Sequence, residues 1–103
     1  MKTFKKKQLT IICELPLASR VVKTLTEAGV TGYTQFDAAS GRGSEGEWNR
    51  DGLVGTSGRM VMIVTILSLD EADGILAQIY ELIEPQMAIA TIANVEVLRD
   101  DIF

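Results

Sequence analysis

The sequence predicts an α+β fold in which two helices lie on one face of a four-stranded antiparallel sheet. Segments of strand character and segments of helical periodicity alternate in the order β-α-β-β-α-β. The chain has 103 residues and 47% hydrophobic content, which is enough for one core, so we expect a single domain over residues 1–103. A glycine-rich stretch at 41–58 separates the second strand from the third.

The first three elements follow from local composition. Residues 9–15 are rich in β-branched side chains and stop at Pro16, which predicts a strand. After Pro16 the apolar residues repeat at helical spacing, and Gly29 is suited to the end of that helix. These apolar positions are Ala18, Val21, Val22, Leu25 and Ala28. Residues 32–38 carry strand-favouring side chains and predict the second strand.

The last three elements have clearer patterns. Residues 60–67 contain almost no polar side chain, which predicts an interior strand covered on both faces. Ser68 and Glu71 match a capping box that begins a second helix, and Pro85 ends it. The apolar stripe of this helix consists of Ala72, Ile75, Leu76, Ile79, Leu82 and Ile83. Residues 88–98 predict the last strand, and the complete order is the ferredoxin-like βαββαβ arrangement.

The second face of this sheet needs a cover that the chain does not contain. Two short helices cover one face only, yet apolar residues occupy consecutive positions in the first, third and fourth strands. We therefore expect copies of the chain to pack their sheets against each other in a closed ring.

The stretch at 41–58 holds six of the nine glycines and the only tryptophan. Glycine loses more backbone entropy on ordering than any other residue, and a loop of about 18 residues in a compact domain is usually functional or disordered. The stretch therefore predicts a long mobile loop. An exposed indole has no core to explain it, so Trp48 indicates contact with a partner. Arg50 either joins that contact or keeps the loop soluble.

Residues 41–44, Gly-Arg-Gly-Ser, form the sharpest local candidate for ligand binding. The glycines let backbone amides approach an anion, and the Arg42 guanidinium offers a bidentate fork to phosphate or carboxylate. The same pattern occurs in ordinary flexible turns with a solvated arginine. Glu45, Glu47 and Asp51 could bind a hard cation, but their spacing matches no calcium loop and favours a solvated acidic loop.

The composition excludes several classes of function. Because the chain has no histidine and one cysteine, Cys13, a Ser-His-Asp triad is impossible and a zinc or iron-sulfur site within one chain is disfavoured. A net charge of −4 and a pI near 4.7 argue against nonspecific nucleic-acid binding. The one basic run, Lys2 with residues 5–7, is interpreted as a solvated tail before the first strand. No apolar run is long enough for a signal sequence or membrane insertion, so we expect a cytoplasmic protein.

Four segments carry a resemblance to a known family. They are Ile12-Cys13-Glu14, residues 27–34 (Glu-Ala-Gly-Val-Thr-Gly-Tyr-Thr), residues 41–44 and residues 95–99 (Val-Glu-Val-Leu-Arg). In their order and spacing the chain resembles the PII superfamily of trimeric signalling proteins over nearly its whole length. It is most similar to the PII-like branch linked to inorganic-carbon uptake, which contains the SbtB and carboxysome-associated PII proteins.

The resemblance implies a homotrimer that binds an adenine nucleotide in each cleft between subunits. Residues 41–58 then correspond to the T-loop that contacts the partner. Gly32 and Thr34 correspond to the adenine pocket, residues 41–43 to the loop base beside the nucleotide, and Arg99 to the phosphate site. The full set expected to bind nucleotide is Gly32, Thr34, Gly41, Arg42, Gly43, Ser44, Arg59 and Arg99. Arg59 and Arg99 would otherwise be solvated residues at strand ends.

The chain also departs from the family pattern. Nitrogen-regulatory members grip a triphosphate with a loop rich in glycine that contains a lysine, and here residues 84–88 (Glu-Pro-Gln-Met-Ala) hold neither. We therefore expect ADP or AMP to bind better than ATP. The only tyrosines are Tyr33 and Tyr80, so the loop lacks the tyrosine that enteric members modify. Neither uridylylation nor the usual 2-oxoglutarate sensing is expected.

Together with the composition, the resemblance implies a non-enzymatic sensor without a metal or a tightly bound cofactor. Its ligands would be ADP or AMP, with bicarbonate as a further candidate, and its partner a bicarbonate transporter or a carboxysome component. Its location would then be the cytoplasm or the carboxysome. A weak Mg²⁺-dependent nucleotide phosphatase that uses loop carboxylates is one alternative. A CutA-like or structural trimer is the other, although the absence of histidine disfavours a metal role.

Overall fold

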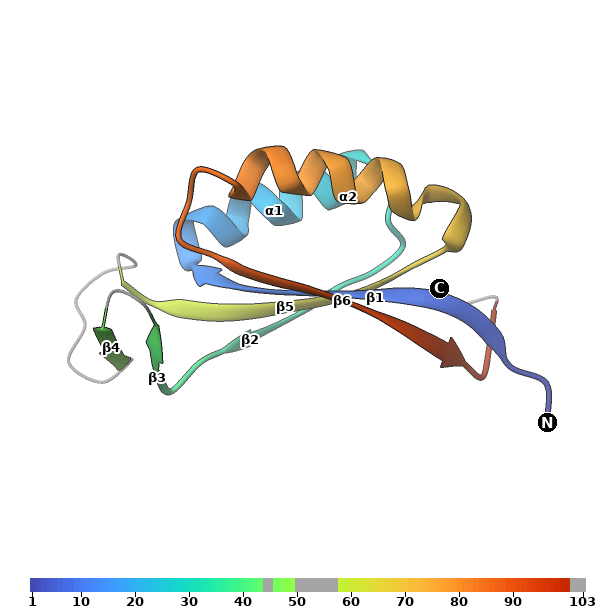
Figure 1. Ribbon diagram of the computed structural model, residues 1–103, viewed down its shortest axis with the longest axis horizontal. Helices are drawn as coiled ribbons and strands as arrows, with labels where there is room; N and C mark the ends of the chain where they lie inside the picture. The colour runs from blue at the N-terminus through green and yellow to red at the C-terminus, as the bar shows by residue number, and fades with distance from the viewer. Residues whose placement is uncertain (44–45, 50–57, 101–103) are drawn as a thin grey trace.

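The computed structural model describes residues 1–43, 46–49 and 58–100. Figure 1 shows the two helices together on one side of the sheet. The elements in chain order are β1 (Phe4–Glu14), α1 (Leu15–Glu27), β2 (Thr34–Asp37), β3 (Ser40–Gly43), β4 (Gly46–Asn49), β5 (Met60–Leu67), α2 (Leu69–Ile83) and β6 (Ile89–Val97).

The main sheet has four strands in the order β2-β5-β1-β6, and each neighbouring pair is antiparallel. The predicted ferredoxin-like α+β fold is therefore confirmed. Strands β5 and β1 occupy the two interior positions, in agreement with the apolar composition of residues 60–67. Strands β3 and β4 form a separate two-stranded hairpin.

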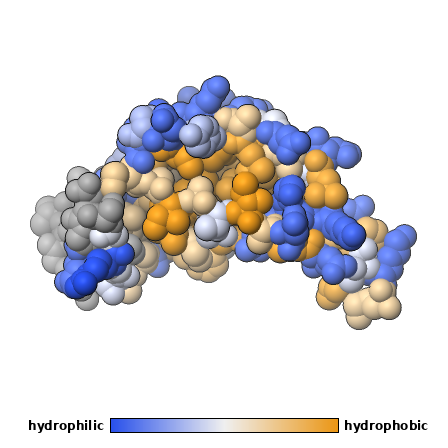
Figure 2. Space-filling view, in the orientation of Figure 1, coloured by the Kyte–Doolittle hydropathy of each residue, from blue (hydrophilic) through white to orange (hydrophobic). Residues whose placement is uncertain are grey.

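The core lies between the helices and the face of the sheet that they cover. Strand β5 contributes alternate residues to it, and the helices contribute the apolar stripes that their spacing predicts. Hydrophilic residues cover the outer side of the helices, and hydrophobic residues gather below them along the middle of the molecule (Figure 2). The core residues that the structure describes include Leu9, Ile11, Cys13, Val21, Leu25, Val61, Ile63, Leu67, Ile75 and Ile79.

No helix in the described part of the chain covers the other face of the sheet (Figure 1). In β5 the burial pattern alternates: Val61, Ile63, Thr65 and Leu67 are buried, and the residues between them are only half-buried. One chain therefore covers a single face of this strand, as expected for two helices, and cover of the second face by another copy of the chain stays a prediction. The open face carries an apolar row that crosses all four strands through the pairs Phe36 with Met62, Met62 with Ile12, and Ile12 with Ile89.

Two expectations about the chain outside the core are corrected. Residues 5–7 do not form a solvated tail, because β1 begins at Phe4 and pairs with β6 along its whole basic run. The Lys6 side chain is 8% exposed and bonded to Asp100. The glycine-rich stretch is not a structureless loop throughout, since β3 and β4 pair within it. Backbone pairing is available to glycine as to any residue, and composition alone does not reveal it.

The helix ends agree with the sequence in position and differ in one detail. Gly29 follows α1 with a φ of 83°, the left-handed conformation that favours glycine. Ser68 is the N-cap of α2, but its side chain makes no capping hydrogen bond, so the predicted capping box with Glu71 does not form. Among the residues that the structure describes, no helix is long and apolar enough to cross a membrane.

Candidate functional site

The base of the glycine-rich stretch is tied together by three hydrogen bonds. The Leu15 amide donates to the Arg59 carbonyl at 2.8 Å, and the Ala38 amide donates to the Met60 carbonyl at 3.0 Å. The Arg59 guanidinium donates to the Asp37 carboxylate at 3.1 Å. The side chain of Arg59 is 33% exposed, so this ion pair is partly shielded from water. Arg59 is thus bonded to the start of α1, and Asp37 and Ala38, on the other side of residues 41–58, are bonded to residues 59–60.

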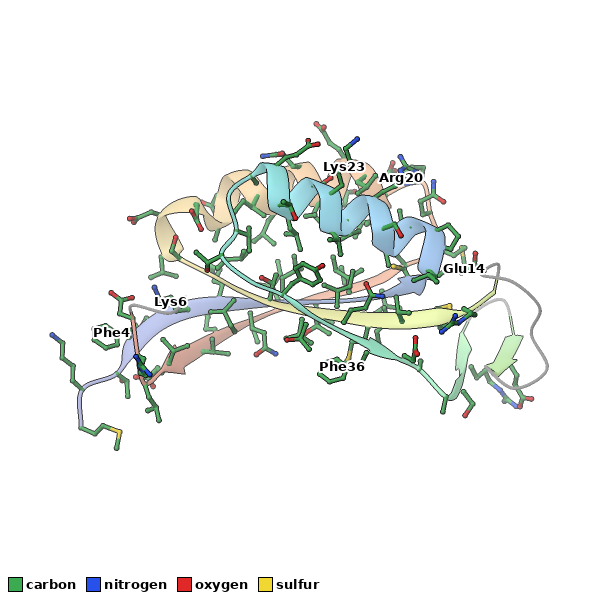
Figure 3. The ribbon with its side chains drawn as sticks, turned by 180° about the vertical axis from the view of Figure 1, so that it is seen from behind. Phe4, Lys6, Glu14, Arg20, Lys23 and Phe36 are labelled. Carbon is green, nitrogen blue, oxygen red and sulfur yellow. The ribbon has the colours of Figure 1, made fainter. Side chains whose placement is uncertain are left out.

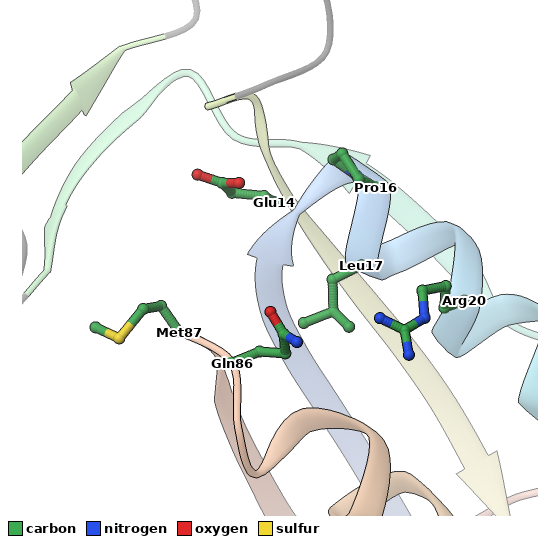
Figure 4. Close-up of a pocket in the computed structure, with 6 residues that line it drawn as sticks. All are labelled: Glu14, Pro16, Leu17, Arg20, Gln86 and Met87. Atoms are coloured by element: carbon green, nitrogen blue, oxygen red, sulfur yellow. The ribbon is translucent and has the colours of Figure 1, made fainter.

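A pocket of about 260 Å³ opens beside this base. It lies between the start of α1 and residues 84–88, the connection from α2 to β6. Figure 4 shows the Arg20 guanidinium directed toward Leu17 and Gln86. The pocket therefore offers a cation, an amide and a carboxylate around an apolar floor. The lining residues are Glu14, Pro16, Leu17, Arg20, Gln86 and Met87.

The hairpin β3–β4 holds part of the predicted Gly-Arg-Gly-Ser site. Gly41 pairs with Trp48 and Gly43 with Gly46, so both glycines belong to a strand ladder. The Arg42 guanidinium forms an exposed ion pair with Glu47 across the hairpin. An anionic ligand would have to compete with this carboxylate for Arg42. Ser44, Arg50, Glu45, Asp51 and the Trp48 side chain lie outside the described residues.

Gly32 and Thr34 lie at the edge of the sheet formed by β2. The Gly32 carbonyl accepts a hydrogen bond of 2.6 Å from the buried Thr65 hydroxyl, which fixes the entry to the strand. A Cβ at Gly32 would meet no atom within 4 Å, so the space in front of its backbone is open in the single chain. Thr34 is exposed and pairs with Val64. Both positions are accessible to a ligand.

Arg99 lies at the opposite end of the sheet from Arg59. Val97, the last residue of β6, pairs with Phe4 at the start of β1, whereas Met60, which follows Arg59, pairs with Glu14 at its end. Figure 3 shows Phe4 and Lys6 at one end of the sheet and Glu14 at the other. Strand β1 has 11 residues, so these ends lie about 33 Å apart at a rise of about 3.3 Å per residue.

The residues expected to bind nucleotide therefore do not converge within one chain. Arg59 and residues 41–43 lie at the loop end, Gly32 and Thr34 along the β2 edge, and Arg99 at the far end. A single small ligand could contact all three groups only if neighbouring chains brought opposite ends together. No group of three His, Cys, Asp or Glu in the described ranges could hold a metal ion.

Cys13 lies on the covered face of β1 and is fully buried. Burial raises the pKa of its thiol to about 11, and the nearby Glu14 carboxylate adds to the shift. A thiol with this pKa is almost entirely protonated at neutral pH, and burial also blocks access to it. Cys13 is therefore a core residue and not a nucleophile.

The sequence analysis did not identify Arg20 as part of a site. The sequence does indicate that Pro16 and Arg20 share one face of a helix, because they are four residues apart. Their nearness to Gln86 and Met87 depends on how α1 and the end of α2 meet, and residue spacing along the chain does not contain that information.

The sequence of this chain matches that of a known protein family. The sequence model described as nitrogen regulatory protein P-II matches residues 6–102. The chain therefore belongs to the nitrogen regulatory protein P-II family, whose members are small regulatory proteins. No curated protein matches this sequence.

Solved PII-like proteins have the same fold. A PII-like signalling protein from Thermus thermophilus is 30% identical, with 98% of this chain and 97% of that chain covered and a TM-score of 0.78. CPII from Thiomonas intermedia K12, bound to ADP and bicarbonate, is 26% identical over 95% of this chain and 93% of that chain, with a TM-score of 0.79. CPII bound to ADP, AMP and bicarbonate gives a TM-score of 0.84 at 24% identity, covering 95% and 92% of the two chains.

Proposed function

We propose that this chain is a non-enzymatic regulatory protein that binds ADP or AMP, together with bicarbonate, in clefts between the subunits of a homotrimer. The observation that carries the proposal is the placement of Arg99 at one end of the sheet and Arg59 with residues 41–43 at the other. Such a split set of ligand contacts is useful only where two chains meet. CPII, a relative at 26% identity, binds ADP and bicarbonate, which supports this ligand class.

The open face of the sheet supports assembly. Phe36 is 48% exposed and Ile89 is 56% exposed, and both belong to the apolar row that crosses the four strands. A row of this kind on a free chain would leave apolar surface in water, whereas packing against a second sheet would remove it. In Figure 3 the Phe36 side chain points away from the helices, toward the side where a neighbouring sheet would lie.

Calorimetric titration of the purified protein with ADP, AMP and ATP, with and without bicarbonate, tests the proposal. We expect ADP and AMP to bind and ATP to bind more weakly, because residues 84–88 offer no lysine to a third phosphate. Arg99→Ala should weaken ADP binding about tenfold or more, the usual effect of losing a charge-assisted hydrogen bond. Lys23→Ala is the matched control, since Lys23 is 77% exposed and pairs only loosely, at 4.0 Å, with Glu27. Absence of binding by all three nucleotides would refute the function.

Mixed trimers test the location between subunits. Arg59→Ala and Arg99→Ala each remove one end of every cleft, so trimers of either variant should bind ADP poorly. Co-expression of both variants should restore a fraction of the clefts, because some will combine an intact Arg59 end with an intact Arg99 end from different chains. If co-expression restores nothing, the two arginines do not share a cleft.

The T-loop, residues 41–58, is proposed to contact the partner through Trp48 and Arg50. Inorganic-carbon uptake is the favoured setting, so the partner would be a bicarbonate transporter or a carboxysome component. Ligand that orders this segment would shift its population toward one binding surface. Co-purification with a tagged bicarbonate transporter, with and without ADP, tests this step. Trp48→Ala should abolish nucleotide-dependent retention, and retention that does not depend on nucleotide would contradict it.

A further inference from the structure

Lys6 is the one lysine of the described residues whose side chain is almost fully buried. It is 8% exposed, and its ammonium lies 2.6 Å from the Asp100 carboxylate, which is 55% exposed. A buried ammonium without a partner is costly, so removing one member of such a pair is far more disruptive than losing a surface ion pair. The contact therefore holds Asp100 firmly against β1.

Two further bonds join the same parts of the molecule. The Thr3 hydroxyl donates to the Glu96 carboxylate at 2.5 Å, and the Lys7 ammonium donates to the Asn94 amide oxygen at 2.9 Å. A pocket of about 330 Å³ lies beside them, lined by Lys5, Lys6, Leu69, Asn94, Val95 and Glu96. The first residues of β1 and the last residues of β6 thus form one connected polar structure at this end of the sheet.

Arg99 lies between two fixed points in this structure. The strand ladder ends where Val97 pairs with Phe4, and three residues later Asp100 is held by Lys6. The chain bends at Leu98 and again at Asp100, so the ladder alone does not determine the course of residues 98–100. The backbone of Arg99 is therefore placed by the ladder on one side and by the Lys6–Asp100 ion pair on the other.

We infer that Lys6 is a positioning residue for nucleotide binding, acting through Asp100 to hold Arg99 where its guanidinium meets the phosphates of the ligand. The inference rests on the proposed function, since it assumes that Arg99 binds phosphate. Lys6 itself does not contact the nucleotide. Because a bidentate guanidinium contact depends on orientation, loosening residue 100 reduces the binding without removing any ligand-contacting group.

Lys6→Met is the primary variant, because methionine fits a buried site and the remaining Asp100 carboxylate is solvated. ADP binding, measured by calorimetry, should weaken about tenfold, and AMP binding should weaken less because AMP carries less phosphate charge. Lys5→Met is the matched control: it removes the same charge one residue away, from an exposed side chain, and should leave the ADP affinity within about twofold of the parent. Equal losses for both variants would show a general charge effect and overturn the inference.

Asp100→Asn distinguishes a positioning effect from a through-space charge effect, because the two predict opposite changes in ADP affinity. This variant removes a negative charge next to Arg99, so a through-space effect would strengthen ADP binding. Loss of the ion pair should instead weaken it, as Lys6→Met does, despite the opposite change in net charge. Thermal melts and the measured molar mass establish that each variant remains folded and assembled. Stronger ADP binding by Asp100→Asn would refute the positioning role.

A double-mutant cycle with Arg99→Ala tests whether Lys6 acts through Arg99. If Lys6 acts through Arg99, Lys6→Met should cause no further loss of ADP affinity in the Arg99→Ala background. An equal, additive loss in both backgrounds would overturn the inference while leaving the proposed function intact. Failure of the parent protein to bind any nucleotide would instead overturn the proposed function, and the inference with it.

Discussion

The two faces of the main sheet are built from similar residues and differ in how deeply these residues are buried. On the covered face of β5, Val61, Ile63 and Leu67 are at most 1% exposed, whereas Met62, Val64 and Ile66 on the open face are only half-buried. Both sets are apolar. The difference shows that the covered face stabilises the single chain, while the open face remains available to stabilise an assembly.

The largest expected effect is on assembly. Met62→Lys places a charge in the middle of the apolar row on the open face, where a neighbouring sheet would have to bury it. We expect the proposed trimer to dissociate to monomers, which light scattering coupled to gel filtration would detect. Gln78→Lys introduces the same charge on the exposed surface of α2 and should leave the molar mass unchanged. A trimeric Met62→Lys protein would show that the open face is not the contact.

The next effect concerns the covered face. Ile63→Ala, made in the monomeric Met62→Lys background, should lower the free energy of unfolding by about 2–5 kcal/mol, because the cavity forms in a closed core. Ile66→Ala on the open face of the same strand should cost clearly less, since Ile66 is already partly in water. Urea denaturation measures both. Equal losses would mean that the two faces do not differ in burial in solution.

The pKa of the Cys13 thiol measures how far water is excluded from the covered face. This pKa is raised from 9.0 to about 11, so between these values the unfolded chain loses its proton while the folded chain keeps it. The protonated Cys13 thiol therefore makes its full contribution to the free energy of unfolding below about pH 9, and this contribution is lost as the pH rises through about 11. The loss amounts to about 2–3 kcal/mol for a shift of this size.

The measurement for Cys13 compares the pH dependence of unfolding with that of Cys13→Ala. The cavity in the variant costs the same at every pH, so only the titration of the thiol changes the difference between the two curves. The parent should lose more stability than Cys13→Ala over this window. Parallel curves would contradict a raised pKa, as would rapid modification of Cys13 by a thiol reagent at neutral pH.

The smallest effect is at the start of α2. The Ser68 side chain makes no capping hydrogen bond, so Ser68→Ala should lower the free energy of unfolding by less than about 0.5 kcal/mol, compared with about 1 kcal/mol for a working N-cap. This outcome would show that apolar packing on the covered face, rather than capping, holds the helix in place. Thermal denaturation measures it, and a loss of a full kcal/mol would indicate that the capping box forms in solution.

The fold class and the order of the two helices and the four main-sheet strands were predictable from the sequence because they depend on local signals. Apolar spacing located both helices, and Pro16, Gly29 and Pro85 marked their limits closely. The interior strand at residues 60–67 was predicted to its terminal residues. Each of these signals lies within a few residues of the structure that it determines.

The candidate site was only partly predictable. The residue types that could bind an anion, among them Arg42, Arg59 and Arg99, stand out in the sequence. Their distribution over opposite ends of the sheet does not, because it follows from strand order and register, which join residues far apart in the chain. Arg42 also acquires an ion-pair partner, Glu47, only when the hairpin forms.

Local sequence signals identify the two helices and the four strands of the main sheet, since hydrophobic period and chain-breaking residues act over short distances. The folded chain alone reveals that Lys6 is buried against Asp100, that β3 pairs with β4, and that one apolar face of the sheet stays open. Each of these depends on contacts between residues that the chain brings together from a distance. Such contacts leave no regular pattern in the sequence, because the position of each contacting residue depends on how all the elements between the two residues pack.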